Sequence, residues 1–319
     1  MARLCCSSYK ILSLALLAVC GAGCRPDPIE LKPRSTASVI RKSEVSQGIP
    51  LDRLRSITNV KPGSGASPSL TFGSLPEDLL PSFAYENGSR GHRLMVEATG
   101  GGCGWLDLDQ DSQWDLYLVQ GGVPDEPPGM TSPTDRVWRQ VAGRFHDVTG
   151  VCGVNEIRYG QGVAAGDFDN DGFDDIFVTN IGENTFFRNL GDGTFHAMEH
   201  WGGQESRLWS TSSAWGDIDL DGDLDLYVCN YVNFDPFHPQ VCTDAAGEQI
   251  QCGPSQVAPV ADELYLNDGA GGFEPVAESL GVKGPGNRAL GIVIADFSGD
   301  STPEIYVAND ATANFMFTR

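Results

Sequence analysis

Short apolar runs alternate with polar, glycine-rich stretches from about residue 95 to the end of the chain. Four of these runs are alike in length and in their aromatic and β-branched content, and each follows an acidic stretch: residues 116–118, 176–178, 226–228 and 305–307. Such runs are short for helices and are typical of buried β-strands. The pattern therefore predicts many short strands joined by tight turns.

A second strand pair follows each of the first three acidic stretches. Residues 185–195 have the pattern of a strand, a glycine turn and a strand, residues 264–273 repeat this order, and residues 137–145 are a plainer copy. This order is typical of a β-hairpin. Each repeating unit thus supplies four short antiparallel strands, which is the blade of a β-propeller.

The acidic stretches share side-chain oxygens at positions 1, 3, 5 and 9 of a common loop. These are Asp107, Asp109, Asp111 and Asp115; Asp167, Asp169, Asp171 and Asp175; Asp217, Asp219, Asp221 and Asp225; and Asp296, Ser298, Asp300 and Glu304. The first residues of successive loops are about 60, 50 and 80 residues apart, as expected for blades with variable connections. The sequence predicts an all-β propeller with blades at about 95–148, 160–200, 212–280 and, in part, 288–319.

Oxygens at this spacing can converge on one hard cation if the chain wraps around it. Position 7, which is Phe173 in the second loop and Asp223 in the third, would add a backbone carbonyl, and Gly172 and Gly222 permit the sharp turn. Calcium accepts six to eight oxygens in irregular geometry, whereas magnesium requires a tight octahedron. We therefore expect calcium. The first loop has Ser112 in place of the glycine, and the fourth loop has two ligand substitutions.

A solvated acidic turn and an EF-hand are the alternative interpretations of the acidic loops. A solvated acidic turn does not explain why the same spacing recurs with an apolar strand after it. An EF-hand requires a bidentate glutamate at position 12 and flanking helices. Position 12 is instead apolar in all four loops, being Leu118, Val178, Val228 and Val307. The EF-hand is therefore rejected.

These residues resemble the FG-GAP/VCBS repeat family over about residues 83–319, and most closely its members with an ASPIC/UnbV domain, the cartilage acidic protein group. The resemblance rests on the two complete acidic loops, on residues 189–195 and on residues 252–254. It implies an extracytoplasmic protein whose calcium loops fasten the blades and whose loop surfaces contact partners. The aspartates of the second and third loops would be ligands. About three and a half blades are present, ending after the second strand of the last, so we expect an incomplete ring and a fragment.

Charge and composition limit the functional classes. The 319 residues include 39 glycines and 19 prolines, and the formal net charge is −22. Such acidity would repel a nucleic-acid backbone, so nucleic-acid binding is not expected. Residues 1–23 have the pattern of a signal peptide, and Cys24 follows a sequence similar to a bacterial lipobox. We expect an envelope lipoprotein with a flexible tether at 24–75, with ordinary cleavage and secretion as the alternative.

The cysteines and the longest insertion complete the picture. Cys242 and Cys252 flank a short polar stretch and are expected to form a local disulfide, whereas Cys103, Cys152 and Cys229 leave at least one thiol unpaired. The insertion at 233–259 is the candidate contact surface for an unknown protein or glycan partner, with a decorated turn as the alternative.

No catalytic motif is recognised, so an adhesion or partner-binding scaffold is expected rather than an enzyme. A propeller hydrolase or lyase acting on extracellular polymers remains an alternative, as does a structural module for a missing domain. Contact with a membrane is expected only through the lipid anchor.

Overall fold

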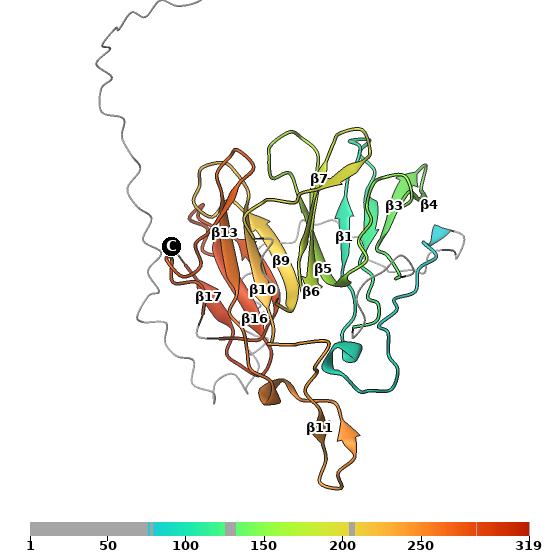
Figure 1. The fold of residues 1–319 in the computed structure, drawn as a ribbon. Coiled ribbons are helices and arrows are strands. Elements are labelled where there is room, and N and C mark those ends of the chain that lie inside the picture. The colour runs from blue at the N-terminus through green and yellow to red at the C-terminus, as the bar shows by residue number, and fades with distance from the viewer. Residues whose placement is uncertain (1–75, 77–78, 125–131, 204–207, 285, 319) are drawn as a thin grey trace, which may run out of the picture.

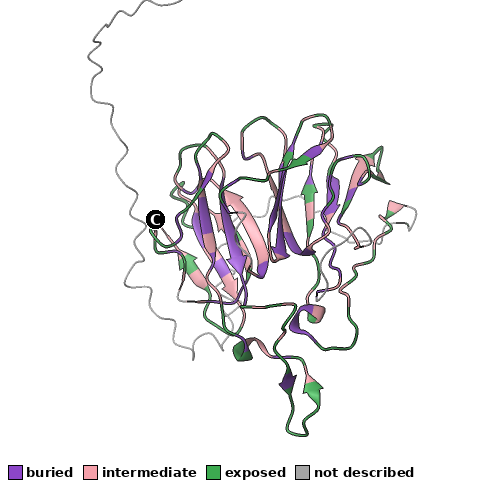
Figure 2. Ribbon diagram, viewed as in Figure 1, coloured by how far each residue is buried: buried purple, intermediate pink, exposed green. Residues whose placement is uncertain are grey.

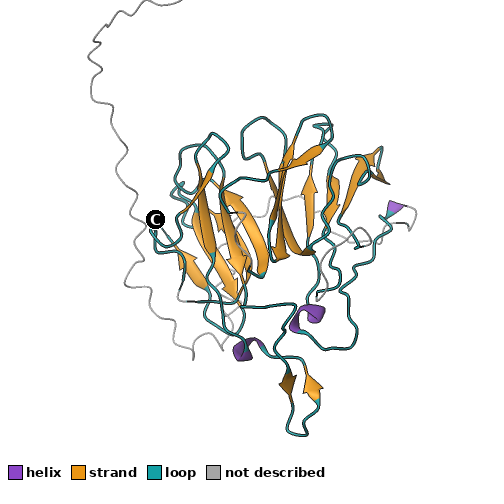
Figure 3. Cartoon of the chain, viewed as in Figure 1, coloured by secondary structure: helices purple, strands orange, loops and turns teal. Residues whose placement is uncertain are grey.

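The computed structural model describes residues 76, 79–124, 132–203, 208–284 and 286–318. The expected signal peptide, Cys24 and the tether at 24–75 lie outside these residues. The described part of the chain is all-β, with five small antiparallel sheets and short 3-10 turns such as η3 (Met95–Ala98) and η4 (Pro254–Gln256) (Figure 3). None of its helices has the length and apolar character needed to cross a membrane.

Four of the sheets lie side by side (Figure 1). The first contains β1 (Cys103–Leu106), β2 (Asp115–Leu118), β3 (Arg136–Val141) and β4 (Arg144–Asp147). The second contains β5 (Tyr159–Gly166), β6 (Asp175–Ile181), β7 (Thr185–Asn189) and β8 (Phe195–Ala197). The third contains β9 (Ser210–Gly216), β10 (Asp225–Asn230), β13 (Glu263–Asn267) and β14 (Phe273–Pro275). The fourth contains β15 (Ala289–Ala295), β16 (Glu304–Asn309) and β17 (Phe315–Phe317).

The four sheets share one strand register, which is why the acidic loops are equivalent. In each sheet the last residue of the first strand pairs with the ninth loop position, for example Leu106 with Asp115 and Gly166 with Asp175. The same pairing joins Ala295 to Glu304. Each sheet therefore has the strand order of a propeller blade, with its acidic loop between the first two strands.

The end of the chain differs from the expectation. The sequence placed it after the second strand of the fourth blade, but β17 (Phe315–Phe317) pairs with β16 as a third strand. The reason is that the glycine turns of the earlier units lie between the third and fourth strands, whereas residues 310–314, with Ala311 at a positive φ of 57°, connect the second strand to the third without a glycine. The fourth sheet is thus three-stranded.

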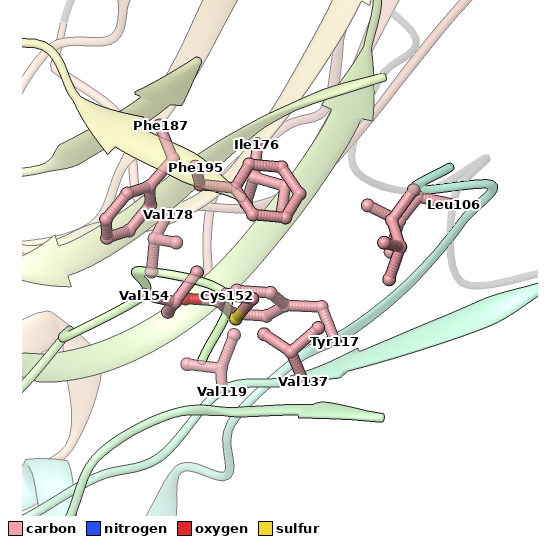
Figure 4. Packing of buried hydrophobic residues seen from close by; sticks show 11 residues of the cluster. Leu106, Tyr117, Val119, Val137, Cys152, Val154, Ile176, Val178, Phe187 and Phe195 are labelled. Atoms are coloured by element: carbon pink, nitrogen blue, oxygen red, sulfur yellow. The ribbon is translucent and has the colours of Figure 1, made fainter. Parts of the chain in front are cut away.

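The hydrophobic core lies between the sheets rather than within a single layer (Figure 2). Between the first and second sheets, Tyr117, Val137, Ile176 and Phe187 pack together (Figure 4). Equivalent clusters fill the spaces between the second and third sheets and between the third and fourth. Burial of apolar side chains between neighbours is the main stabilisation of such repeats.

The first strands of adjacent sheets approach closely where their side chains are smallest. A Cβ atom on Gly162 would lie 2.6 Å from the carbonyl oxygen of Thr211 on the next sheet. Glycine is therefore required for this approach. The close packing brings the ends of β5 and β9, and with them two acidic loops, next to each other.

A tyrosine and a carboxylate recur inside the first and third sheets. The Tyr117 hydroxyl donates to Asp135 Oδ2 at 2.7 Å, and Tyr227 donates to Asp262 Oδ2 at 3.1 Å. Burial raises the pKa of both carboxyls, that of Asp262 to about 6. Phe177 holds the tyrosine position in the second sheet. These pairs fasten the second and third strands of a blade away from the acidic loops.

The insertion at 233–259 carries the fifth sheet, a hairpin of β11 (Cys242–Thr243) and β12 (Gln249–Ile250), which projects from the sheets in Figure 1. Cys242 and Cys252 form a disulfide in it, with the two Cα atoms 5.2 Å apart. Both cysteines belong to a buried cluster with Met95 and Trp209. Part of the insertion, which the sequence assigned to a polar surface, is therefore core.

Candidate metal centre

The first residue of each acidic loop holds the loop in its wrapped shape. Asp167 accepts the N–H of Asp171 at 3.0 Å through Oδ1 and the N–H of Gly172 at 2.8 Å through Oδ2. Asp107 accepts the N–H groups of Asp111 and Ser112 in the same way, at 3.0 and 2.9 Å. These bonds draw the turn back toward the start of the loop, as an ion-binding loop requires.

Three acidic side chains converge in each of the four loops. In each set, one ligand oxygen from every residue lies within 4.8 Å of the others. The sets are Asp107, Asp109 and Asp115; Asp167, Asp169 and Asp175; Asp217, Asp219 and Asp225; and Asp296, Asp300 and Glu304. Positions 1, 3 and 9 of the first three loops are thus brought together, and these groups could hold a metal ion.

Unpartnered oxygens test whether the residues fit a cation. Asp109 Oδ1 and Asp217 Oδ1 are buried and have no hydrogen-bond partner in the described part of the chain. A buried carboxylate oxygen without a donor is costly unless a cation takes that place. The all-oxygen donor set suits a hard divalent ion. The residues therefore fit a metal ion.

The ninth position has two roles. Asp225 is fully buried and accepts the N–H of Asn267 at 3.0 Å and the N–H of Ile218 at 2.7 Å, so it joins its own loop to the end of β13. Its pKa is raised to about 7, chiefly by burial. The nearby Asp219 and Asp221 carboxylates contribute to this rise, and the two N–H bonds oppose it. Asp175 has the same contacts in the second loop, and its pKa is also raised to about 7.

The fifth and seventh positions lie differently from the expectation. In the first three loops, Asp111, Asp171 and Asp221 are outside the convergent sets, and each caps the turn by accepting the N–H of position 7. Phe173 and Asp223, at position 7, donate the backbone N–H that forms this hydrogen bond. The fifth carboxylate of these three loops thus shapes the turn.

Arginines that the sequence reasoning missed reach two of the loops. Arg139 pairs with Asp109 and Asp111, and Arg188 pairs with Asp169 and Asp171. The strand register places Leu266 at the corresponding position of the third loop. The signal was available in the hairpin alignment, where both arginines follow the residue paired with the second strand.

A comparison with known families bears on these loops. The family described as FG-GAP-like repeat matches residues 107–178 and 167–228. Residues 107–228 carry two FG-GAP-like repeats. The second acidic loop lies in the overlap, so it ends one repeat and begins the next. No curated protein matches the chain, and the expected likeness to the ASPIC/UnbV group has no support from these comparisons.

The fourth loop lies beyond the matched FG-GAP-like repeats and is the least regular. Asp296 and Asp300 are exposed, and Glu304 accepts the N–H groups of Phe297 at 2.6 Å and Ser298 at 3.2 Å. Hydrogen bonds, first that from the Ser301 N–H, lower the pKa of Asp296. Ser298 is outside the convergent set. The longer glutamate reaches the place that aspartate holds in the other loops.

A cavity of about 490 Å³ lies at the opposite end of the blades from the acidic loops, between the second sheet and the insertion. It is lined by Tyr159 at the start of β5 and by residues 233–237. Arg158 lines it as well and pairs with Glu183 at 3.4 Å and with the buried Glu156 at 3.3 Å. The cavity thus has both charged and aromatic walls.

Proposed function

We propose that the protein is an exported scaffold whose FG-GAP-like blades are stabilised by calcium. The observation that carries this proposal is the repeated set of three carboxylates whose ligand oxygens lie within 4.8 Å of one another, together with buried oxygens of Asp109 and Asp217 for which the described residues provide no donor. Calcium suits an irregular, all-oxygen loop better than magnesium does. A bound ion would neutralise the carboxylates at positions 1, 3 and 9, which otherwise repel one another.

Thermodynamic stability tests this proposal. Extracellular modules bind calcium with dissociation constants of about 0.1 to 1 mM, so millimolar calcium adds roughly 0.4 to 1.4 kcal/mol per occupied site. Urea unfolding with calcium, with magnesium and with a chelator should rank calcium first. The Asp217→Asn variant should lose part of the increment. Equal stability with calcium and chelator would contradict calcium binding.

A second role, binding of a protein or glycan partner, is favoured by the cavity beside the insertion. Phe237 on its wall is 54% exposed, and loops on rigid frames commonly carry binding residues. Phe237→Ala should weaken the capture of a partner from envelope material. Val241→Ala is the control and should leave capture unchanged, because Val241 is also an exposed apolar residue of the insertion but does not line the cavity. Equal capture by both variants would contradict this site, and turnover of a glycan would favour the alternative of an enzyme.

Export and lipidation at Cys24 are part of the proposal. Metabolic labelling with a radioactive fatty acid should mark the parent chain and not the Cys24→Ser variant. Release of an unlabelled, processed chain into the medium would instead support ordinary cleavage and secretion.

A further inference from the structure

Neighbouring acidic loops are joined through their fourth residues. Asn170, in the second loop, donates from Nδ2 to Asp223 Oδ1 at 2.8 Å and to the Gly222 carbonyl at 3.4 Å, both in the third loop. Gln110, at the same position of the first loop, donates from Nε2 to the Gly172 carbonyl of the second. Both donors have a positive φ, 55° for Asn170 and 57° for Gln110.

These bonds reach the part of the next loop that must be ordered for an ion to bind. Gly222, whose carbonyl accepts from Asn170, lies in the turn of the third loop, and its own N–H donates to Asp217 Oδ2 at 3.2 Å. The following residue, Asp223, would supply the backbone carbonyl ligand of the third loop. The donor in turn lies in a loop that its own first aspartate wraps, since Asp167 accepts the N–H of Asp171.

We propose that an ion in one loop strengthens ion binding in the next, through Gln110 and Asn170. This inference rests on the proposed calcium binding. An ion in the second loop fixes residues 167–171 and so presents the Asn170 amide in its bonding position. The third loop then loses less conformational freedom when it takes its own ion, and by linkage the effect is reciprocal.

The series of bonds stops at Leu220. This residue holds the fourth position of the third loop with a similar φ of 66°, but its side chain has no donor. Within the described residues, no hydrogen bond joins loop 217–225 to loop 296–304. The coupling therefore extends over the first, second and third loops and excludes the fourth.

Calcium calorimetry on full-length variants with two active loops measures the coupling. Asp107→Asn with Asp296→Asn leaves the second and third loops. In this background we expect the second ion to bind about fivefold more tightly than it would to an independent site. This factor corresponds to the net free energy of one hydrogen bond. Adding Asn170→Ala should remove this gain, and adding Leu220→Ala should keep it. Asp107→Asn with Asp167→Asn leaves the third and fourth loops, which should bind independently.

The outcomes separate the inference from the proposal on which it rests. Binding of two ions without cooperativity in the first background, or cooperativity unchanged by Asn170→Ala, would overturn the coupling alone. Absence of any calcium binding by the parent chain would overturn the calcium proposal itself. Circular dichroism of each variant, together with urea unfolding in chelator, shows that the changes act on a folded protein.

Discussion

The residue at the sixth loop position determines the backbone strain of the turn. Gly172 and Gly222 adopt φ of 94° and 102°, and Ser112 is held at 65° in the same place. A non-glycine residue in the left-handed region is strained by roughly 1–2 kcal/mol. The first loop therefore stores strain that the second and third avoid.

Ser112→Gly should accordingly stabilise the protein by about 0.5–1 kcal/mol, because relief of strain exceeds the added entropy of the unfolded chain. Gly222→Ala is the matched control. Its Cβ would meet nothing within 4 Å, so a loss of about 1 kcal/mol would report backbone strain alone. Urea unfolding in chelator measures both, and a destabilising Ser112→Gly would contradict the argument.

Protonation of the ninth position gives a second prediction for single residues. Burial raises the pKa of Asp175 and Asp225 from 3.8 to about 7 in the metal-free protein. Their contribution to stability is therefore fully present below about pH 4 and is lost as the pH rises through 7. Calcium needs the ionised form, so the calcium increment should change in the opposite direction and fall on acidification.

Unfolding experiments from pH 5 to pH 8, with and without calcium, measure both trends. The variant Asp175→Asn with Asp225→Asn should flatten the metal-free profile, because amides do not titrate and keep one acceptor oxygen. A metal-free profile unchanged by these substitutions would contradict the assignment of the pH dependence to these two carboxyls.

Among the secondary-structure elements, strands β7 and β13 are hydrogen-bonded to the preceding blade through the asparagine at their ends. Asn267, at the end of β13, donates to the Phe168 carbonyl of the preceding blade at 2.7 Å and to the Leu224 carbonyl of its own at 3.2 Å. Asn189 ends β7 and makes the equivalent pair of bonds. Each asparagine side chain thus forms hydrogen bonds with the acidic loops of two adjacent blades.

Asn267→Ala should cost about 2–4 kcal/mol, since it leaves two carbonyls without donors at a site that is 5% exposed. Gln140→Ala is the control, because Gln140 lies near the end of β3 at the same register. Among the described contacts, its side chain donates only to the Trp114 carbonyl of its own blade, at 3.2 Å. It should cost less than about 1 kcal/mol. Equal losses of unfolding free energy in the two variants would contradict a stabilising role for the hydrogen bond between blades.

The charge of the whole molecule opposes its compact state. A formal charge of −22 repels itself most strongly when the loops hold no ion. Raising sodium chloride from about 0.02 to 0.5 M shortens the Debye length from roughly 20 to 4 Å and should stabilise the metal-free protein. The added stability from calcium should shrink in parallel. Thermal scans at several salt concentrations measure this, and a salt-independent midpoint would contradict it.

The sequence predicted what repeats locally and missed what joins the repeats. Acidic spacing, glycine turns and apolar runs were enough for the all-β fold and for the grouping of positions 1, 3 and 9. The contacts of Asn170 and Asn267 with adjacent loops could not be predicted, because periodicity does not give the distance between blades. β17 was missed because the glycine turns that marked the earlier hairpins follow the third strand, and residues 310–314 before β17 contain no glycine.

The contact between residues 92–98 and the insertion has a kinetic consequence. Arg93 donates to the Gln249 carbonyl at 2.5 Å, and Gln251 donates to the Met95 carbonyl at 3.3 Å, between partners 156 residues apart in sequence. Contacts between neighbouring blades can form as each blade folds, but this one must wait until two intervening blades have brought the partners together. Closing so long a loop slows folding. Formation of this contact, which ties the segment before the first sheet to the insertion of the third, is therefore expected to be slow.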